Sequence, residues 1–140
     1  MEDIIKILIK EALNVRKNSY SPYSNYAVGA SILADNKKIY VGTNIENASI
    51  GGTICAERSA ITSACSDGVR LIKIIVIVGG KANCEKNEMD WAFPCGICRQ
   101  FLNEFSDEET TVVVAKSTEE YKIFKLNELL PSAFGPNNLK

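Results

Sequence analysis

The sequence contains no histidine, so no imidazole is available to bind a metal ion. Any metal site in this chain must be completed by cysteine or carboxylate side chains. Long apolar runs are also missing, because the longest, Ile74 to Val78, is far too short to span a bilayer. The first residues, Met1 to Lys6, lack the basic stretch and apolar segment of a secretory signal. We therefore expect a cytoplasmic protein that does not bind a membrane.

A strongly basic region is missing as well, and this bears on the substrate. Lys and Arg total 16 against 17 Asp and Glu, and no stretch is rich in Lys and Arg. This balance argues against a strong electrostatic grip on nucleic acid, so we expect a small-molecule substrate and no nucleic-acid partner. With 140 residues, of which 46% are hydrophobic and 24% charged, the chain is typical of one globular domain. We expect that domain to cover residues 1–140.

Hydrophobic periodicity predicts an alternation of helices and short strands. An apolar stripe at positions 4, 5, 8, 12 and 13 predicts an amphipathic helix near the N-terminus. Runs rich in Val, Ile and Tyr at 27–34 and 38–44 predict a hairpin, followed by a long polar loop at 44–53. The pattern then predicts a helix from 55 to about 67, a buried strand at 71–78, a loop at 79–93, a helix at 95–105, strands at 111–115 and 121–125, and a short helix at 126–130. This order predicts a layered α/β fold around a mixed sheet.

Five cysteines are present, and two segments place three of them at the start of predicted helices: Cys55-Ala-Glu57 and Pro94-Cys95-Gly-Ile-Cys98. In a reducing compartment these thiols are metal ligands, catalytic groups or buried residues rather than disulfide partners. A helix N-terminus favours thiolate over thiol, and residues three apart share one helical face. Three thiolates favour Zn²⁺ over hard cations such as Mg²⁺. The spacing therefore predicts a zinc site.

The remaining cysteines leave alternatives open. Cys65 lies ten residues beyond Cys55 on the same predicted helix, roughly 15 Å away, so we expect a buried apolar residue there. Cys84 could reach the ion in principle and close a structural zinc site, although we expect its loop to be solvated. A redox-active Cys-x-x-Cys pair is a further alternative. With three thiolates alone, one position stays open for water, as in catalytic zinc sites. Glu57 would then lie beside that water, or it is only a favourable acid at a helix N-terminus.

Six stretches, in order, resemble the small cytidine deaminases of pyrimidine salvage in which three cysteines bind zinc. These are SPYS at 21–24, VGA at 28–30, NIENAS at 44–49, CAER at 55–58, PCGICRQ at 94–100 and LLPSAFGP at 129–136. The resemblance covers nearly the whole chain. It implies a three-layer α-β-α sandwich with a mixed central sheet of about five strands. It also implies zinc-dependent hydrolysis of cytidine and 2′-deoxycytidine to uridine and 2′-deoxyuridine, with release of ammonia.

The resemblance further implies which residues perform the chemistry. Cys55, Cys95 and Cys98 would bind one Zn²⁺ per subunit, and Glu57 would carry protons between water and the base.

It also implies how the nucleoside is bound. Asn44 and Glu46 would hydrogen-bond the ribose hydroxyls, and Tyr26 would lie beside the nucleoside. The backbone of Ala56 would contact the base. Phe134 would reach over the base of a neighbouring subunit, because the three-cysteine members are homotetramers with composite active sites.

Two arginines directly follow the cysteine motifs. Three thiolates give the zinc site a net negative charge, which opposes deprotonation of the bound water. We expect Arg58 and Arg99 to donate hydrogen bonds to the ligand sulfurs and so restore the acidity of the metal. Ordinary surface positions for both side chains are the alternative.

Some features depart from the family pattern or leave rival functions open. Ile50 replaces an aromatic residue that is common in the family, and the segment from Cys84 to Phe93, with Trp91, matches no family pattern. This segment either shapes access to the pocket or packs on the surface. The rival functions are a blasticidin-type or other small aminohydrolase and a non-catalytic structural zinc domain. A polynucleotide deaminase is disfavoured because the chain lacks a basic groove.

Overall fold

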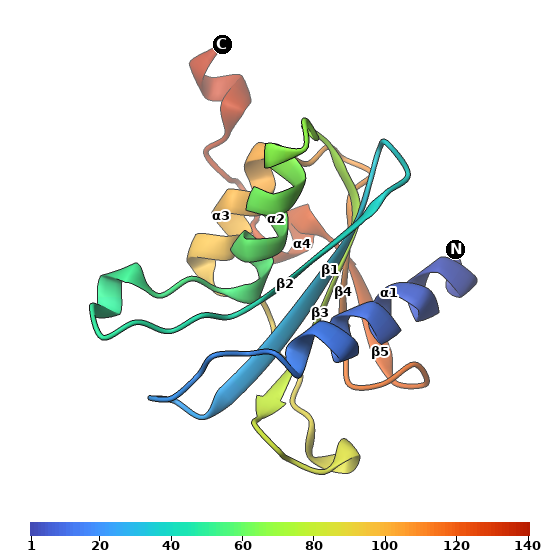
Figure 1. The fold of residues 1–140 in the computed structure, drawn as a ribbon. Helices are drawn as coiled ribbons and strands as arrows, with labels where there is room; N and C mark the ends of the chain where they lie inside the picture. The colour runs from blue at the N-terminus through green and yellow to red at the C-terminus, as the bar shows by residue number, and fades with distance from the viewer.

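The computed structural model describes all of residues 1–140, and Figure 1 shows a twisted sheet with helices on both of its faces. Every helix and strand predicted from the sequence is present. In chain order the elements are α1 (Glu2–Arg16), β1 (Tyr26–Ala34), β2 (Ile39–Thr43), α2 (Ala56–Ser66), β3 (Ile72–Lys81), α3 (Gly96–Glu104), β4 (Thr111–Ala115), β5 (Tyr121–Lys125) and α4 (Leu126–Leu129). Short 3₁₀ turns lie at Ile50–Gly52, Lys86–Glu88 and Pro136–Leu139.

The central sheet has five strands in the order β2-β1-β3-β4-β5. Neighbouring strands are antiparallel except for β3 and β4, which are parallel. A parallel pair needs a long crossover, and residues 82–110, which include α3, provide it. The predicted mixed sheet is therefore confirmed.

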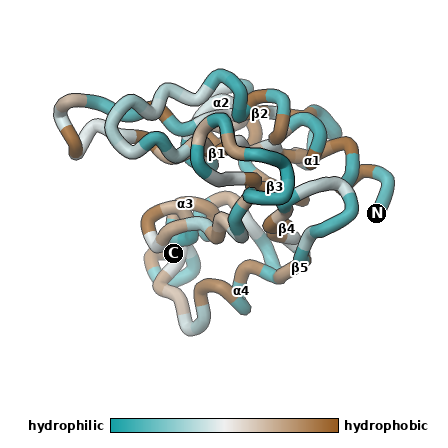
Figure 2. Tube along the Cα trace, turned by 90° about the horizontal axis from the view of Figure 1, so that it is seen from below, coloured by the Kyte–Doolittle hydropathy of each residue, from teal (hydrophilic) through white to brown (hydrophobic).

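The sheet separates two apolar cores, which confirms the three-layer arrangement. Strand β3 contributes to both cores: Ile75 and Ile77 pack on the side of α2, α3 and α4, whereas Ile74, Val76 and Val78 pack on the side of α1. This two-sided burial explains why the strand reads as a continuous apolar run. The C-terminal end lies beside α3, away from α1 (Figures 1 and 2).

Helix α2 approaches β2 closely at Gly42. A side-chain carbon at this position would lie 2.3 Å from the Ala60 nitrogen and 2.7 Å from the Ala56 oxygen, so only glycine fits. The first turn of α2 is thereby placed directly on the sheet. By contrast, the segment between β2 and α2 extends away from the body (Figure 1), and Ile50 within it is 85% exposed.

The predicted loop at 79–93 is only partly correct. Residues 79–81 continue β3, where they pair with 26–28 of β1. Gly79 and Gly80 suggested a loop, but they are required because the following segment crosses back over the strand. A side-chain carbon at Gly79 would lie 2.7 Å from the Ala92 Cβ, and one at Gly80 would lie 3.3 Å from the Cys84 sulfur. None of the helices combines the length and the apolar character needed to cross a membrane.

Candidate metal centre and substrate pocket

Three cysteines from two helix N-termini meet at one point. Cys55 is the N-cap of α2, Cys95 is the N-cap of α3, and Cys98 lies in the first turn of α3. Their sulfurs all lie within 4.8 Å of one another, and those of Cys55 and Cys95 are 3.9 Å apart. Tetrahedral zinc with Zn–S bonds of about 2.3 Å separates its sulfurs by roughly 3.8 Å, so these three donors fit zinc.

The other two cysteines lie outside this cluster, which excludes a four-cysteine site. Cys65 is half-exposed rather than buried, because it lies at the C-terminal end of α2, where Arg70 donates a hydrogen bond to its sulfur at 3.3 Å. The loop around Cys84 is solvated as expected, with Lys81, Asn83, Glu85, Lys86 and Asn87 exposed, but Cys84 itself is half-buried. It packs against the core beneath α1, with its sulfur 3.7 Å from the Met89 sulfur.

The chain stabilises negative charge at the thiol cluster. Hydrogen bonds from Cys98 and Arg58 lower the pKa of Cys55 to about 5, against the opposing effect of burial. The pKa of Cys98 is raised, because it donates to Cys55 and because it is fully buried. The lowered pKa favours the thiolate form of Cys55. A thiolate is the form that binds a metal ion.

Glu57 lies in the first turn of α2, next to the thiols but outside the group of potential ligands. Glu57 is only 4% exposed. Burial, together with the charge on Cys55, raises the pKa of Glu57 to about 7. A carboxyl group with a pKa near neutrality can both accept and return a proton, which general acid–base catalysis requires.

The two arginines differ in what they contact. Nη2 of Arg58 donates to the sulfur of Cys55 at 3.5 Å. The predicted hydrogen bond from Arg99 to a ligand sulfur is wrong: its Nε donates to the Pro94 carbonyl and its Nη1 to the Leu129 carbonyl, both at 2.7 Å. Arg99 lies in the second turn of α3, where two backbone acceptors are within reach. It therefore ties the residues just before α3 to the end of α4.

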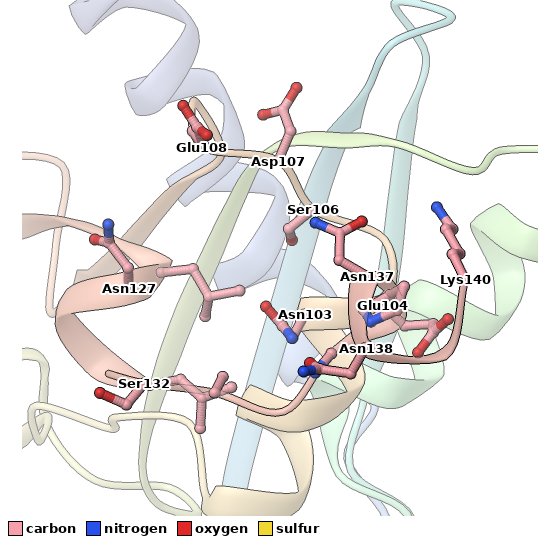
Figure 3. Close-up of a pocket in the computed structure, with 15 residues that line it drawn as sticks. Asn103, Glu104, Ser106, Asp107, Glu108, Asn127, Ser132, Asn137, Asn138 and Lys140 are labelled. Carbon is pink, nitrogen blue, oxygen red and sulfur yellow. The ribbon is translucent and has the colours of Figure 1, made fainter.

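A cavity of about 320 Å³ opens beside the thiols and reaches the loops before β1 and after β2. Of the residues named from the sequence, it contains two ligands and five others. These are Cys55, Cys95, Tyr26, Asn44, Glu46, Ala56 and Glu57. A second, polar hollow of about 400 Å³ lies between α3, α4 and the C-terminal turn (Figure 3) and includes none of the thiols.

Comparison with known proteins identifies the family. Residues 3–115 match the family model for the cytidine and deoxycytidylate deaminase zinc-binding region. The chain belongs to this family. The matched region contains all three clustered cysteines, so the zinc cofactor predicted from the sequence is confirmed.

Individual relatives match this chain over almost the full length of both proteins. Two are named cytidine deaminase: that of Mycoplasma genitalium is 38% identical over 91% of this chain and 92% of its own, and that of Halalkalibacterium halodurans is 39% identical over 92% of each. The crystal structure of cytidine deaminase from Burkholderia pseudomallei superposes with a TM-score of 0.80 at 35% identity, covering 91% of this chain and 97% of that one. That from Mycobacterium tuberculosis gives 0.75 at 32% identity, covering 92% and 95%.

At the end of the cavity away from the metal, Glu46 is fixed by a turn. Its carboxylate accepts hydrogen bonds from the backbone N–H groups of Tyr23 at 2.9 Å and Ser24 at 3.1 Å. The Ser24 hydroxyl also donates to it. These donors, the Ser24 hydroxyl above all, lower the pKa of Glu46, so the deaminase carries a fixed anion here.

Asn44 is almost buried at the same end of the cavity. Its side-chain oxygen accepts from the Ser19 hydroxyl at 2.6 Å and from the Val28 N–H at 2.9 Å. Its nitrogen donates to the Tyr26 carbonyl at 2.8 Å, which leaves one amide N–H for a ligand. The Tyr26 ring lines the cavity, and burial with the neighbouring Asp90 raises the pKa of Tyr26 to about 12. The Tyr26 hydroxyl is therefore neutral.

Phe134 does not line the cavity of its own chain. The residue is 60% exposed on the segment after α4, and its carbonyl accepts a hydrogen bond from the Gln100 side chain at 2.8 Å.

Sequence reasoning missed part of the cavity wall. Ser24 was visible within the SPYS stretch, but nothing in the sequence indicated its hydrogen bond to Glu46. Ala92 and Phe93 also line the cavity, from the segment that matches no family pattern. Of the two expectations for that segment, this position favours the one in which it shapes access to the pocket. The wall is completed by the apolar residues Val28, Ile54 and Ile77 and by Thr53.

Proposed function

We propose that this chain is a cytidine deaminase that converts cytidine and 2′-deoxycytidine to uridine and 2′-deoxyuridine. Water is consumed and ammonia is released. The observation that carries the proposal is one cavity that contains two of the three clustered thiols and a buried carboxyl group at one end and polar groups suited to a sugar at the other. Family membership supports the same reaction.

Cys55, Cys95 and Cys98 would hold the zinc ion of each subunit. When bound, zinc supplies a Lewis acid that activates a water molecule for attack on C4 of the cytosine ring. The Arg58 guanidinium, 3.5 Å from the Cys55 sulfur, offsets part of the negative charge of the three thiolates. This contact would keep the metal site acidic enough to act on water.

Glu57 would carry the protons. Its carboxylate would take one proton from the attacking water and deliver it to N3 of the base. It would then take the second proton from the hydroxyl group added at C4 and pass it to the amine, so that the C4–N bond breaks, ammonia leaves and a C4 carbonyl remains. Burial keeps its pKa near 7, so both protonation states are accessible at neutral pH. The buried position also keeps bulk water from competing for these protons.

The other end of the cavity would bind the sugar and orient the base. The fixed carboxylate of Glu46 is suited to accept hydrogen bonds from ribose hydroxyls, and Asn44 has one N–H to donate. Tyr26 would pack beside the nucleoside, and the Ala56 backbone at the N-terminus of α2 would contact the base. These contacts would set C4 at the metal.

The proposal extends to assembly and cellular role. We infer a homotetramer in which Phe134 projects from one subunit over the base bound in another, which is consistent with the exposure of Phe134 outside its own cavity. Ile50, 85% exposed on the extended loop, would lie at a subunit boundary. Residues 1–140 would act as one deaminase domain in pyrimidine salvage, in the reducing cytoplasm, where thiolates stay available to the metal.

Ammonia release from a panel of substrates tests the function. The purified protein should act on cytidine and 2′-deoxycytidine, lose activity with a zinc chelator, and regain it when zinc is restored. Higher activity on blasticidin or on a cytosine-containing oligonucleotide than on cytidine would contradict the proposal. Full zinc occupancy without turnover of any of these substrates would indicate a structural zinc domain.

A further inference from the structure

The segment between β3 and α3 contributes to the cavity wall directly before Cys95 and Cys98, two of the three proposed zinc ligands. It is fixed to the sheet at Asp90, because the Asp90 N–H donates to the Gly79 carbonyl at 2.9 Å. The missing side chain of Gly79 lets Ala92 lie against the strand. The Trp91 ring contacts two lysine ammonium groups, with Lys116 at 4.8 Å and Lys122 at 4.4 Å from its ring centroid.

Phe93 is the aromatic side chain that this segment contributes to the cavity. Its ring packs on Phe124 of β5, with the ring centroids 5.4 Å apart and the planes tilted by 60°. The residue is 40% exposed, although it lies two positions from the metal ligand Cys95. A supported ring with an uncovered surface in a binding cavity is suited to contact a ligand.

The chemistry of the base indicates which edge meets Phe93. The reacting carbon, C4, lies between N3 and C5 in the cytosine ring. If Glu57 exchanges a proton with N3, the N3 edge faces the first turn of α2. The C5 edge then faces the other ligand-bearing segment, residues 92–95, where Ala92 and Phe93 line the cavity.

We propose that Phe93 is a specificity-determining residue whose ring lies against the C5 edge of the pyrimidine and limits the size of substituents there. This inference rests on the proposed function. Neither the three thiols nor Glu57 can make this selection, because they act on C4 and N3. Phe93 sets the room on the C5 side because its ring is supported by Phe124 and its backbone is fixed by Trp91 and Asp90.

Substitution of Phe93 tests the proposal with paired substrates. We would compare kcat/KM for 5-methylcytidine and cytidine in zinc-loaded wild type, Phe93→Leu and Phe93→Ala. The ratio should rise about tenfold or more in Phe93→Ala, the lower end of what one methyl group costs in a tight pocket, and less in Phe93→Leu. Phe124→Leu, which removes the supporting ring, should raise the ratio in the same direction by a smaller factor.

The control is Phe101→Leu, which removes a ring on α3 that contacts Phe105 and lies outside the cavity. It should leave the ratio unchanged. Calorimetric binding of 5-methyluridine and uridine gives the same comparison without catalysis, so failure of the proposed function can be told apart from failure of this inference. If the ratio of kcat/KM for 5-methylcytidine to that for cytidine in Phe93→Ala stays within about twofold of the wild-type ratio, the inference is overturned.

Discussion

The two ends of the cavity each carry a glutamate, and the surroundings of these residues are opposite. Glu57, at the metal end, is 4% exposed, and burial raises its pKa to about 7. Glu46, at the far end, is fixed by the Ser24 hydroxyl and two backbone N–H groups, which lower its pKa. A carboxyl group near neutrality can move protons, whereas a permanent anion can only accept hydrogen bonds. The environment thus gives one residue type two tasks in one cavity.

The structural elements that form the two ends of the cavity differ as well. The metal end is built from the first turns of α2 and α3, and α2 is placed on the sheet by Gly42. The far end is built from the loops that flank β1 and β2. Helix starts placed on a sheet fix positions closely, which suits bond making, while a hydrogen-bonded turn is suited to binding.

Removal of a metal ligand is expected to have the largest effect. Cys98→Ala deletes a fully buried ligand, so zinc content and deamination should both fall to near background, as measured by metal analysis and ammonia release. Cys65→Ala is the matched control, since Cys65 is half-exposed and outside the cluster. Loss of zinc from the control instead of from Cys98→Ala would contradict the assigned ligand set.

A change at the far end should affect binding more than chemistry. Glu46→Gln removes the charged acceptor, and a hydrogen bond to a charged group contributes about 1.5–3 kcal/mol, so KM for cytidine should rise roughly 10- to 100-fold. The value of kcat should change less, and zinc content should not change. Steady-state kinetics measure both. A fall in kcat with an unchanged KM would place Glu46 in the chemistry and remove the contrast between the two ends.

Arg58 connects the charge of the thiols to the reaction. Arg58→Gln should lower kcat and zinc affinity, each by about tenfold or more, because outer partners of metal ligands commonly contribute that much. Arg70→Gln is the control, since Arg70 also donates to a cysteine sulfur, that of Cys65, away from the metal. Equal effects of the two substitutions would show that the contact to Cys55 has no special role.

Substitution of Arg99 should have the smallest effect on zinc binding. Because it donates to the carbonyls of Pro94 and Leu129, Arg99→Gln should lower the free energy of unfolding by about 1–3 kcal/mol while zinc binding is largely kept. Denaturant unfolding of the zinc-loaded protein measures this change. Loss of zinc at unchanged stability would restore the role first expected from its position in the motif.

The sequence predicted the metal end better than the rest of the molecule, for physical reasons. Ligand spacing at a helix start is a local property, so Cys55, Cys95 and Cys98 could be read from the chain alone. The contacts of Arg99 depend on where the end of α4 lies, which no local pattern encodes. Gly79 and Gly80 predict a loop because glycine usually marks one, whereas in the structure they make room for a crossing segment.

The different roles of Glu57 and Glu46 are tested most directly by measuring kcat and zinc content of Glu57→Gln alongside Glu46→Gln. We predict that Glu57→Gln binds zinc and cytidine but that its kcat falls about a thousandfold or more, because the neutral amide cannot transfer protons. A Glu57→Gln protein with full zinc occupancy and near wild-type kcat would contradict this role of Glu57.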